Sequence, residues 1–224
     1  MGSLKEGFAA LQMELAASLP EEANKLLKQA TQRLVDGALI NLLITVGDKF
    51  PQFSLPNVVG NAINSEDLLG QGPLVVSFYR GGWCPYCNLE LRAYQAVLDD
   101  IHTLGAELVA ISPQLPDESM TMVAKANLTF EVLSDTGNSL AEHLGLVFEV
   151  TDKVADLYRS MGYDLERING NVHWTLPVPA TFVIGMDNTV VRAYSHADHT
   201  RRLEPAEALD SLRGLRNSAR TRCW

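Results

Sequence analysis

The chain has 224 residues, of which 46% are hydrophobic and 20% are charged, and its formal net charge at pH 7 is −9. That length can bury a sizeable core and fits one large domain, or one domain with an appendage. The negative charge disfavours a nucleic-acid surface, which needs clustered lysine and arginine side chains to contact phosphates. The one basic cluster, RGLRNSARTR at 213–222, trails the last predicted helix. No nucleic-acid partner is expected.

The apolar stretches of the sequence do not predict a membrane segment. Lys5, Glu6 and Glu14 interrupt the N-terminal apolar residues, so no signal-peptide core forms there. The run ALINLLITV at 38–46 is too short to span a bilayer. We therefore expect a cytoplasmic protein with no membrane partner. In a reducing cytosol, three cysteines do not form a structural disulfide framework, and a C-x-x-C pair there indicates catalysis or metal binding.

The first 45 residues have a helical pattern and are expected to form an N-terminal extension. Apolar residues recur at intervals of three and four, on one helix face: Leu4, Phe8, Leu11, Leu15 and Leu19. A second helix is expected to begin at Pro20–Glu22, because proline and acidic residues favour a first turn. This helix is expected to bury Leu26, Leu27, Ala30 and Leu34. The apolar stripe must pack on the main domain or on a partner subunit.

From residue 46 onward, predicted strands and helices alternate. The continuous apolar run PLVVSFY at 73–79 indicates a central strand covered on both faces. Further strands are predicted at 107–112 and 131–135, helices at 88–105, 116–127 and 139–145, a hairpin over 180–194 turning at Asp187–Asn188, and a last helix at 204–215. This order predicts an α/β fold, a thioredoxin-like three-layer sandwich with a central mixed β-sheet. It would occupy residues 46–218, followed by a C-terminal tail at 219–224.

The stretch FYRGGWCPYC at 78–87 places two cysteines at the junction between a predicted strand and the next helix. Cys84 would lie at or just before the helix N-terminus, and Cys87 in its first turn. Unpaired backbone N–H groups and the positive end of the helix dipole stabilise a thiolate there, which lowers a cysteine pKa from about 8.5. Two cysteines at this spacing can form a disulfide with little backbone movement, so that one attacks and the other resolves. Arg80 adds positive charge nearby.

Two other interpretations of the cysteine pair stay open. Both residues could be small buried side chains at a strand–helix junction. A zinc site would need two more ligands; His196 and His199 have the spacing H-x2-H, but the chain has no second C-x-x-C. No metal and no cofactor are expected. Cys223, next to the C-terminus, is expected to be incidental, with intermolecular pairing as its less favoured role.

Polar residues outside the pair are expected to be solvated. Glu90 and Arg92 follow the cysteines on the predicted helix, where a solvated face is favoured over a catalytic role. His196, Asp198 and His199 are predicted to form a polar loop before the last helix. A Cys–His catalytic pair stays open as an alternative, which their spacing does not support.

Four segments resemble the alkyl hydroperoxide reductase/thiol-specific antioxidant family, the peroxiredoxins: GDKFPQFSLPNVVGNAI (47–63), VVSFYRGGWCPYCNLELRAY (75–94), VAISPQ (109–114) and PATFVIGMDNTVV (179–191). The resemblance is strongest to a branch in which a thioredoxin-type C-x-x-C lies on a peroxiredoxin frame. The stretch TLPVPATFVI also resembles the thioredoxin family, whose members have a cis-proline facing the cysteine pair. Pro179 occupies that position.

The resemblance also implies roles for single residues. Peroxiredoxins carry P-x-x-x-T/S-x-x-C after the strand, so Cys87 takes the peroxidatic position, Cys84 the Thr/Ser position and Arg80 the proline position. The family's later, peroxide-activating arginine falls near Pro179, so neither the threonine nor the arginine is in its expected place. In thioredoxin-like proteins the first cysteine attacks, which here is Cys84. The two resemblances therefore leave open which cysteine attacks first.

The resemblance implies a thiol-dependent oxidoreductase that uses the Cys84/Cys87 couple. The expected supporting residues are Trp83, Pro85, Pro179, Thr181 and Arg80. Reduction of peroxides is the favoured activity, and exchange with protein disulfides is the alternative. The electron donor would be a thioredoxin-like protein or a low-molecular-weight thiol. A third alternative is a non-enzymatic redox-sensing module, and the apolar N-terminal helices allow a homodimer.

Overall fold

The computed structural model describes residues 3–37 and 42–221, with side chains up to residue 217. Cys223 and residues 38–41 of the apolar run lie outside the described residues. Within the described ranges, none of the helices has the length and apolar character needed to cross a bilayer.

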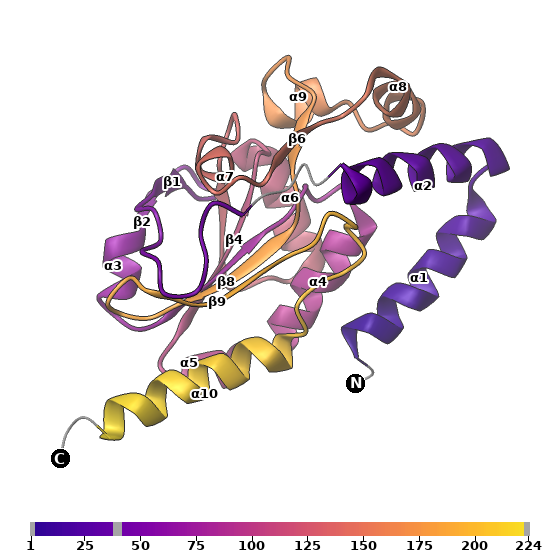
Figure 1. The fold of residues 1–224 in the computed structure, drawn as a ribbon. Coiled ribbons are helices and arrows are strands. Elements are labelled where there is room, and N and C mark those ends of the chain that lie inside the picture. The colour runs from indigo at the N-terminus through magenta and orange to yellow at the C-terminus, as the bar shows by residue number, and fades with distance from the viewer. Residues whose placement is uncertain (1–2, 38–41, 222–224) are drawn as a thin grey trace.

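A five-stranded mixed sheet forms the centre of the molecule (Figure 1). In spatial order its strands are β5 (Glu131–Ser134), β4 (Glu107–Ser112), β3 (Leu74–Phe78), β8 (Ala180–Ile184) and β9 (Val190–Ser195). Strands β3, β4 and β5 are parallel, whereas β8 is antiparallel to both β3 and β9. Every residue of β3 and β8 is buried, which explains their uninterrupted apolar sequences.

Alternate residues of the central strands face two separate hydrophobic layers. Val75 and Val183 belong to the layer that contains side chains of α4 (Pro85–Ala96), α5 (Leu98–Thr103), α6 (Pro116–Ala126) and α10 (Pro205–Thr221). Val76 and Phe182 belong to the opposite layer, with α3 (Ser65–Leu69) and α7 (Ser139–His143). The predicted three-layer α/β sandwich is therefore confirmed. A small hairpin of β1 (Ser54–Pro56) and β2 (Ala62–Asn64) lies outside the central sheet.

Two local details refine the predicted elements. The helix predicted over 88–105 is two helices, α4 and α5, because Val97 leaves helical geometry at φ −114 and ψ 10. A β-branched residue tolerates such a break well, since it gains less than other residues from a helical conformation. The β8–β9 hairpin turns where predicted, with Asn188 in the left-handed region at φ 62.

The N-terminal helices pack on the main domain, which answers the question left open by their apolar stripe. In α1 (Leu4–Ser18), Leu4 and Phe8 are buried in the layer that contains α4. In α2 (Glu21–Asp36), Leu26, Leu27 and Ala30 pack on a third hydrophobic cluster, formed by α8 (Asp152–Ser160) and α9 (Leu165–Asn169). These three and Leu34 are only partly buried, contrary to expectation, because α2 lies at the surface.

The segment at 147–177 adds elements that the sequence patterns do not predict. It comprises β6 (Val147–Glu149), α8, α9 and β7 (Thr175–Pro177), with β6 and β7 paired antiparallel. The strands, with three residues each, and the five-residue α9 are too short to show a period, but α8 does have an amphipathic pattern, with Val154, Ala155 and Tyr158 buried. This segment brings Tyr158 and Tyr163 against Trp83, beside the cysteine pair.

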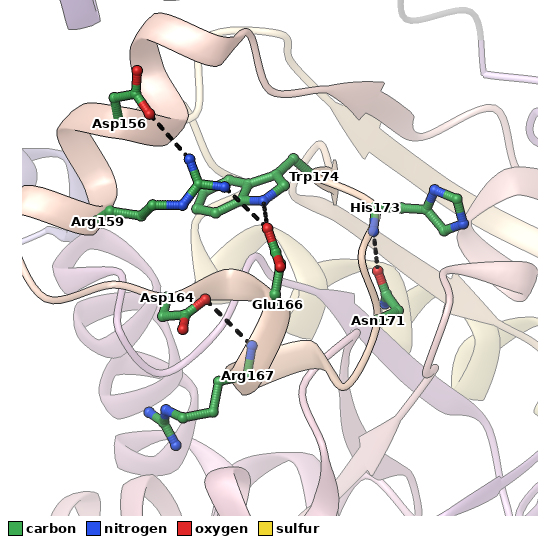
Figure 2. Close-up of polar contacts among 8 residues, drawn as sticks. All are labelled: Asp156, Arg159, Asp164, Glu166, Arg167, Asn171, His173 and Trp174. Atoms are coloured by element: carbon green, nitrogen blue, oxygen red, sulfur yellow. Dashed lines mark hydrogen bonds and ion pairs between the residues drawn. The ribbon is translucent and has the colours of Figure 1, made fainter.

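A polar network on the surface joins the parts of this segment (Figure 2). Arg159 contacts Asp156 and Glu166 at 3.0 Å each, and its guanidinium lies 4.3 Å from the ring centre of Trp174. The Trp174 indole Nε1 donates to the same Glu166 carboxylate at 2.8 Å. The Asp164 carboxylate caps α9 by accepting from the Arg167 backbone N–H. Exposed ion pairs are individually weak, so we attribute order in this segment to the network as a whole.

The central layer gives a direct test of the fold. The Phe182 side chain is 0% exposed and its ring lies 5.3 Å from Phe50 and 6.1 Å from Phe78. Phe182→Ala is expected to lower the free energy of unfolding by about 3–5 kcal/mol, measured by denaturant titration. The control Val172→Ala, at a side chain 75% exposed, should change it by less than about 0.5 kcal/mol. A loss below about 1 kcal/mol for Phe182→Ala would contradict this packing.

Candidate active site

The two cysteines lie at the predicted strand–helix junction. Cys84 is the N-cap residue of α4, Pro85 is its first helical residue, and Cys87 lies in its first turn. Proline is well suited to that position, because the first helical N–H has no partner within the helix. Both cysteines are free thiols and both are 0% exposed. Gly81 adopts φ 146, and a Cβ there would overlap Trp83 Nε1, so the backbone that leads to the cysteine pair requires glycine at this position.

Arg80 points its guanidinium at the first sulfur. Its Nη2 donates to Cys84 Sγ at 3.0 Å, and its Nη1 lies 3.5 Å from the hydroxyl of Tyr158. The Arg80 Cζ atom lies 5.3 Å from the ring centre of Trp83. The side chain is buried at the end of β3. Its positive charge therefore acts on the Cys84 sulfur with little solvent screening.

A second arginine, Arg202, approaches the other sulfur. Its Nη2 is 3.6 Å from Cys87 Sγ, its Nε donates to Glu90 Oε2 at 2.9 Å, and its Nη1 donates to the backbone carbonyl of His199. The side chains of Arg202 and Glu90 are only 2% and 1% exposed. The prediction of a solvated Glu90 is thus wrong, because the opposite charge of Arg202 makes burial of this carboxylate tolerable. Arg92, the other residue of that prediction, is exposed.

The surroundings give the two cysteines opposite protonation preferences. Burial alone would raise the pKa of the Cys84 thiol, but the hydrogen bond from Cys87 and the charge of Arg80 outweigh it and hold that pKa well below its usual range. Burial, together with the hydrogen bond to Cys84 and the negative charge there, raises the pKa of Cys87 well above its usual range. The couple is therefore one thiolate, Cys84, next to one thiol, Cys87.

Two further groups beside the pair titrate abnormally. Burial, and secondarily the charge on Cys84, raises the pKa of Glu90 to about 7 against the opposing effect of Arg202. Burial and the charges of Arg80 and Arg202 lower the pKa of His199, so its imidazole is neutral at pH 7. The His199 ring is half-buried in the predicted loop and meets Tyr86 edge-on at 5.3 Å. In the described ranges, no three His, Cys, Asp or Glu side chains are grouped to hold a metal ion.

The remaining predicted site residues have mostly packing environments. Trp83 is half-buried between Tyr158 and Tyr163, at 5.1 and 5.4 Å, as expected of a residue that shields the pair. Thr181 is buried in β8. Pro179 is buried just before β8, but none of the described peptide bonds is cis, so the expected cis-proline is wrong. The backbone is paired in extended strands on both sides of it, and a trans bond is the lower-energy form.

Two groups at the site escape sequence reasoning. Arg202 is 115 residues from Cys87 along the chain, in a loop without a recognisable motif. Tyr158 belongs to the segment at 147–177, which the patterns do not predict. The only sequence signal for Arg202 or Tyr158 is indirect. The threonine and the arginine of the family are not in their expected places, so other side chains must contact the sulfurs.

A groove adjoins the cysteine pair on the side of Trp83. Its volume is about 330 Å³, and its lining includes Gly82, Trp83, Asn88, Met122 and Tyr163. A larger hollow of about 440 Å³ is lined by residues of β6 and β7 and includes none of the residues described above as contacting the sulfurs. The groove beside Trp83 is the nearer of the two to the pair, because Gly82, Trp83 and Asn88 flank the cysteines in sequence, but neither sulfur lines it.

Comparison with known sequences identifies relatives of this chain. The model of the AhpC/TSA family matches residues 46–193. A putative peroxiredoxin of Mycobacterium tuberculosis is 36% identical over 92 residues, covering 41% of this chain and 58% of the relative. Peroxiredoxin Bcp of Escherichia coli is 30% identical over 103 residues, covering 46% of this chain and 65% of the relative. The matches thus span less than two thirds of either relative.

Solved structures show the same fold. Peroxidoxin BcpB from Mycobacterium tuberculosis superposes with a TM-score of 0.61 at 22% identity, covering 77% of this chain and 98% of that one. AhpC from the same organism superposes with a TM-score of 0.58 at 19% identity, covering 79% of this chain and 95% of that one. The α/β architecture inferred from element order is the architecture of these proteins.

The contact between Arg80 and Cys84 predicts a shift in thiolate titration. Arg80→Met removes the charge but keeps an unbranched apolar side chain of similar length. The pKa of Cys84 should then rise toward its ordinary value of about 8.5, followed by thiolate absorbance in the ultraviolet against pH. Arg92→Met, at an exposed arginine of α4, is the control and should leave the titration unchanged. Identical curves for Arg80→Met and wild type would contradict the assigned role of Arg80.

The buried Glu90 carboxyl predicts a pH-dependent stability. Its pKa rises from 4.5 to about 7 on folding, so the carboxyl binds a proton more tightly in the folded state than in the unfolded state. The associated stability is present below pH 4.5 and lost as pH rises to about 7. The free energy of unfolding of wild type minus that of Glu90→Gln should therefore fall by about 3 kcal/mol across this range, measured by denaturant unfolding. A difference that is flat or rises with pH would refute the assignment.

Proposed function

Because the chain belongs to the AhpC/TSA family, we propose that it is a thiol-dependent peroxidase that reduces hydroperoxides with the Cys84/Cys87 couple. The observation that carries this proposal is the position of one guanidinium at each sulfur, with Arg80 on Cys84 and Arg202 on Cys87. The couple then has a nucleophile and a resolving thiol at the N-terminus of one helix.

The Cys84 thiolate attacks one oxygen of the peroxide. An S–O bond forms as the O–O bond breaks, Cys84 becomes a sulfenic acid, and the leaving alkoxide takes a proton and departs as an alcohol, or as water from hydrogen peroxide. The Cys87 thiol then attacks the sulfenic sulfur, which forms the Cys84–Cys87 disulfide and releases water. Two donor thiols reduce this disulfide and leave as a donor disulfide, restoring both cysteines.

The two arginines supply the hydrogen-bond donors that the family's threonine and arginine would provide. Peroxide cleavage needs donors for the charge that develops on the leaving oxygen. Arg80 and Arg202 reach the sulfurs from positions that differ from those of the family's threonine and arginine, and each presents several N–H donors. This arrangement supports Cys84 as the attacking residue, although alignment with the family places Cys87 in the peroxidatic position.

Burial of both sulfurs favours small peroxides over protein disulfides as substrates. Exchange with a protein partner needs an accessible sulfur and room for an attacking thiol in line with it. Both cysteines are 0% exposed, and the adjoining groove has the size of a small molecule. The donor is then a small thiol, or a thioredoxin-like protein that acts after the disulfide becomes accessible. The proposed location is the cytoplasm, and the proposed assembly is a homodimer.

The order of attack is tested by single cysteine variants in a Cys223→Ser background, which removes the remaining thiol. Reduced protein is mixed rapidly with hydrogen peroxide and followed by tryptophan fluorescence, because Trp83 is adjacent to the pair. Cys87→Ser should keep one fast turnover, since it retains the thiolate, and Cys84→Ser should lose it.

The reverse result, a fast phase lost only in Cys87→Ser, would move the attack to Cys87. A wild-type rate no faster than that of a free low-pKa thiol would refute peroxidase function altogether.

A further inference from the structure

Helix α1 lies outside the segment matched by the family and yet contacts the residues that hold the cysteines (Figure 1). The Phe8 ring meets Tyr86, which lies between the two cysteines in sequence, edge-on at 5.6 Å. The same ring centre lies 5.8 Å from the Arg202 guanidinium carbon. Phe8 is only 5% exposed. A cation this close to an aromatic ring is attracted to it, more strongly where water is excluded.

The first turn of α1 is tied to the same loop as Arg202. Glu204, two residues beyond Arg202, accepts hydrogen bonds from the backbone N–H groups of Leu4 at 3.0 Å and Lys5 at 2.9 Å. These N–H groups have no partner within the helix, and the positive end of the helix dipole favours a carboxylate there. The start of α1 and the loop that carries Arg202 are therefore fixed to each other.

These contacts leave Arg202 little freedom. Glu90 holds its Nε, the His199 carbonyl holds Nη1, and the Phe8 ring lies beside the guanidinium carbon, so that Nη2 is directed at Cys87. We propose that α1 belongs to the redox site. The helix positions Arg202 against Cys87 and blocks the approach of bulky disulfides to the cysteines from this side. The expected effect on catalysis rests on the proposed function, whereas the contacts between α1 and Arg202 do not depend on that function.

The two parts of the inference predict opposite changes in reactivity. Without the Phe8 ring, Arg202 loses one of the three contacts that fix its guanidinium, and because its charge acts on Cys84, the thiolate should become less stable. The reaction with peroxide then slows. Loss of the ring also uncovers Tyr86 and the first turn of α4, so a large disulfide reagent should react faster. Unfolding would also expose both thiols and return their pKa to the ordinary value, so the rates are compared only among variants whose near-ultraviolet circular dichroism matches that of wild type.

The test is Phe8→Ala in the Cys223→Ser background. The pKa of the couple is measured by thiolate absorbance, and rates are measured with hydrogen peroxide and with an aromatic nitrobenzoate disulfide. The pKa should rise, so that at a pH below the wild-type pKa the peroxide reaction slows by the factor by which the thiolate fraction falls. The disulfide reaction should accelerate. Met13→Ala, in the same helix at a side chain 76% exposed, and Phe8→Tyr, which keeps the ring, should match wild type.

Glu204→Gln tests the same positioning without removing core volume, and it decides the question if Phe8→Ala does not fold. Its control is Asp210→Asn, at an exposed carboxylate of α10 that pairs with Arg213 instead of α1. Glu204→Gln should shift the pKa and both rates in the directions given for Phe8→Ala. If both variants match their controls, α1 is only a packing element and the inference is overturned. If wild type is a slow peroxidase, the proposed function fails, and the pKa and disulfide rates still decide the role of α1.

Discussion

Two arginine side chains buried beside two cysteines are the constraint on which the rest of the site depends. A guanidinium removed from water is costly unless a negative charge and hydrogen-bond acceptors compensate it. Glu90 compensates Arg202, and the Cys84 thiolate compensates Arg80. The thiolate therefore stabilises the buried arginine as much as the arginine activates the sulfur. Tyr158 of α8, Tyr163 between α8 and α9, the loop before α10 and helix α1 exclude water around this arrangement.

Much of the fold was predictable because its signals are local. The buried strand at 74–78, the cysteines at the next helix N-terminus and the hairpin turn at Asn188 each follow from a few neighbouring residues. The order of these elements then specified the three-layer architecture. The segment at 147–177 escaped prediction because its strands have three residues each, too few to show a period.

The site was less predictable, because its contacts join distant parts of the chain. Glu90 has the sequence context of a solvated helical residue, and only the position of Arg202 in space reverses that interpretation. Phe8 looks like any apolar residue of an amphipathic helix until its ring is found beside a guanidinium. The direction of Arg80 is likewise absent from its sequence neighbours. Residue types near the cysteines can be read from the sequence, but the pairing of charges depends on tertiary packing.

The 3.0 Å contact between Arg80 and Cys84 also affects the energetics of electron transfer. When Cys84 enters a disulfide it loses its negative charge, and the buried Arg80 loses its counter-ion. The oxidised form therefore carries an unbalanced cation in a medium that solvates it poorly. Stabilising the dithiol relative to the disulfide raises the reduction potential of the couple, as in strongly oxidising thiol proteins. In the proposed cycle, the same charge that activates the nucleophile thus makes its disulfide easy to reduce, so that a weakly reducing thiol would suffice to return the protein to its starting state.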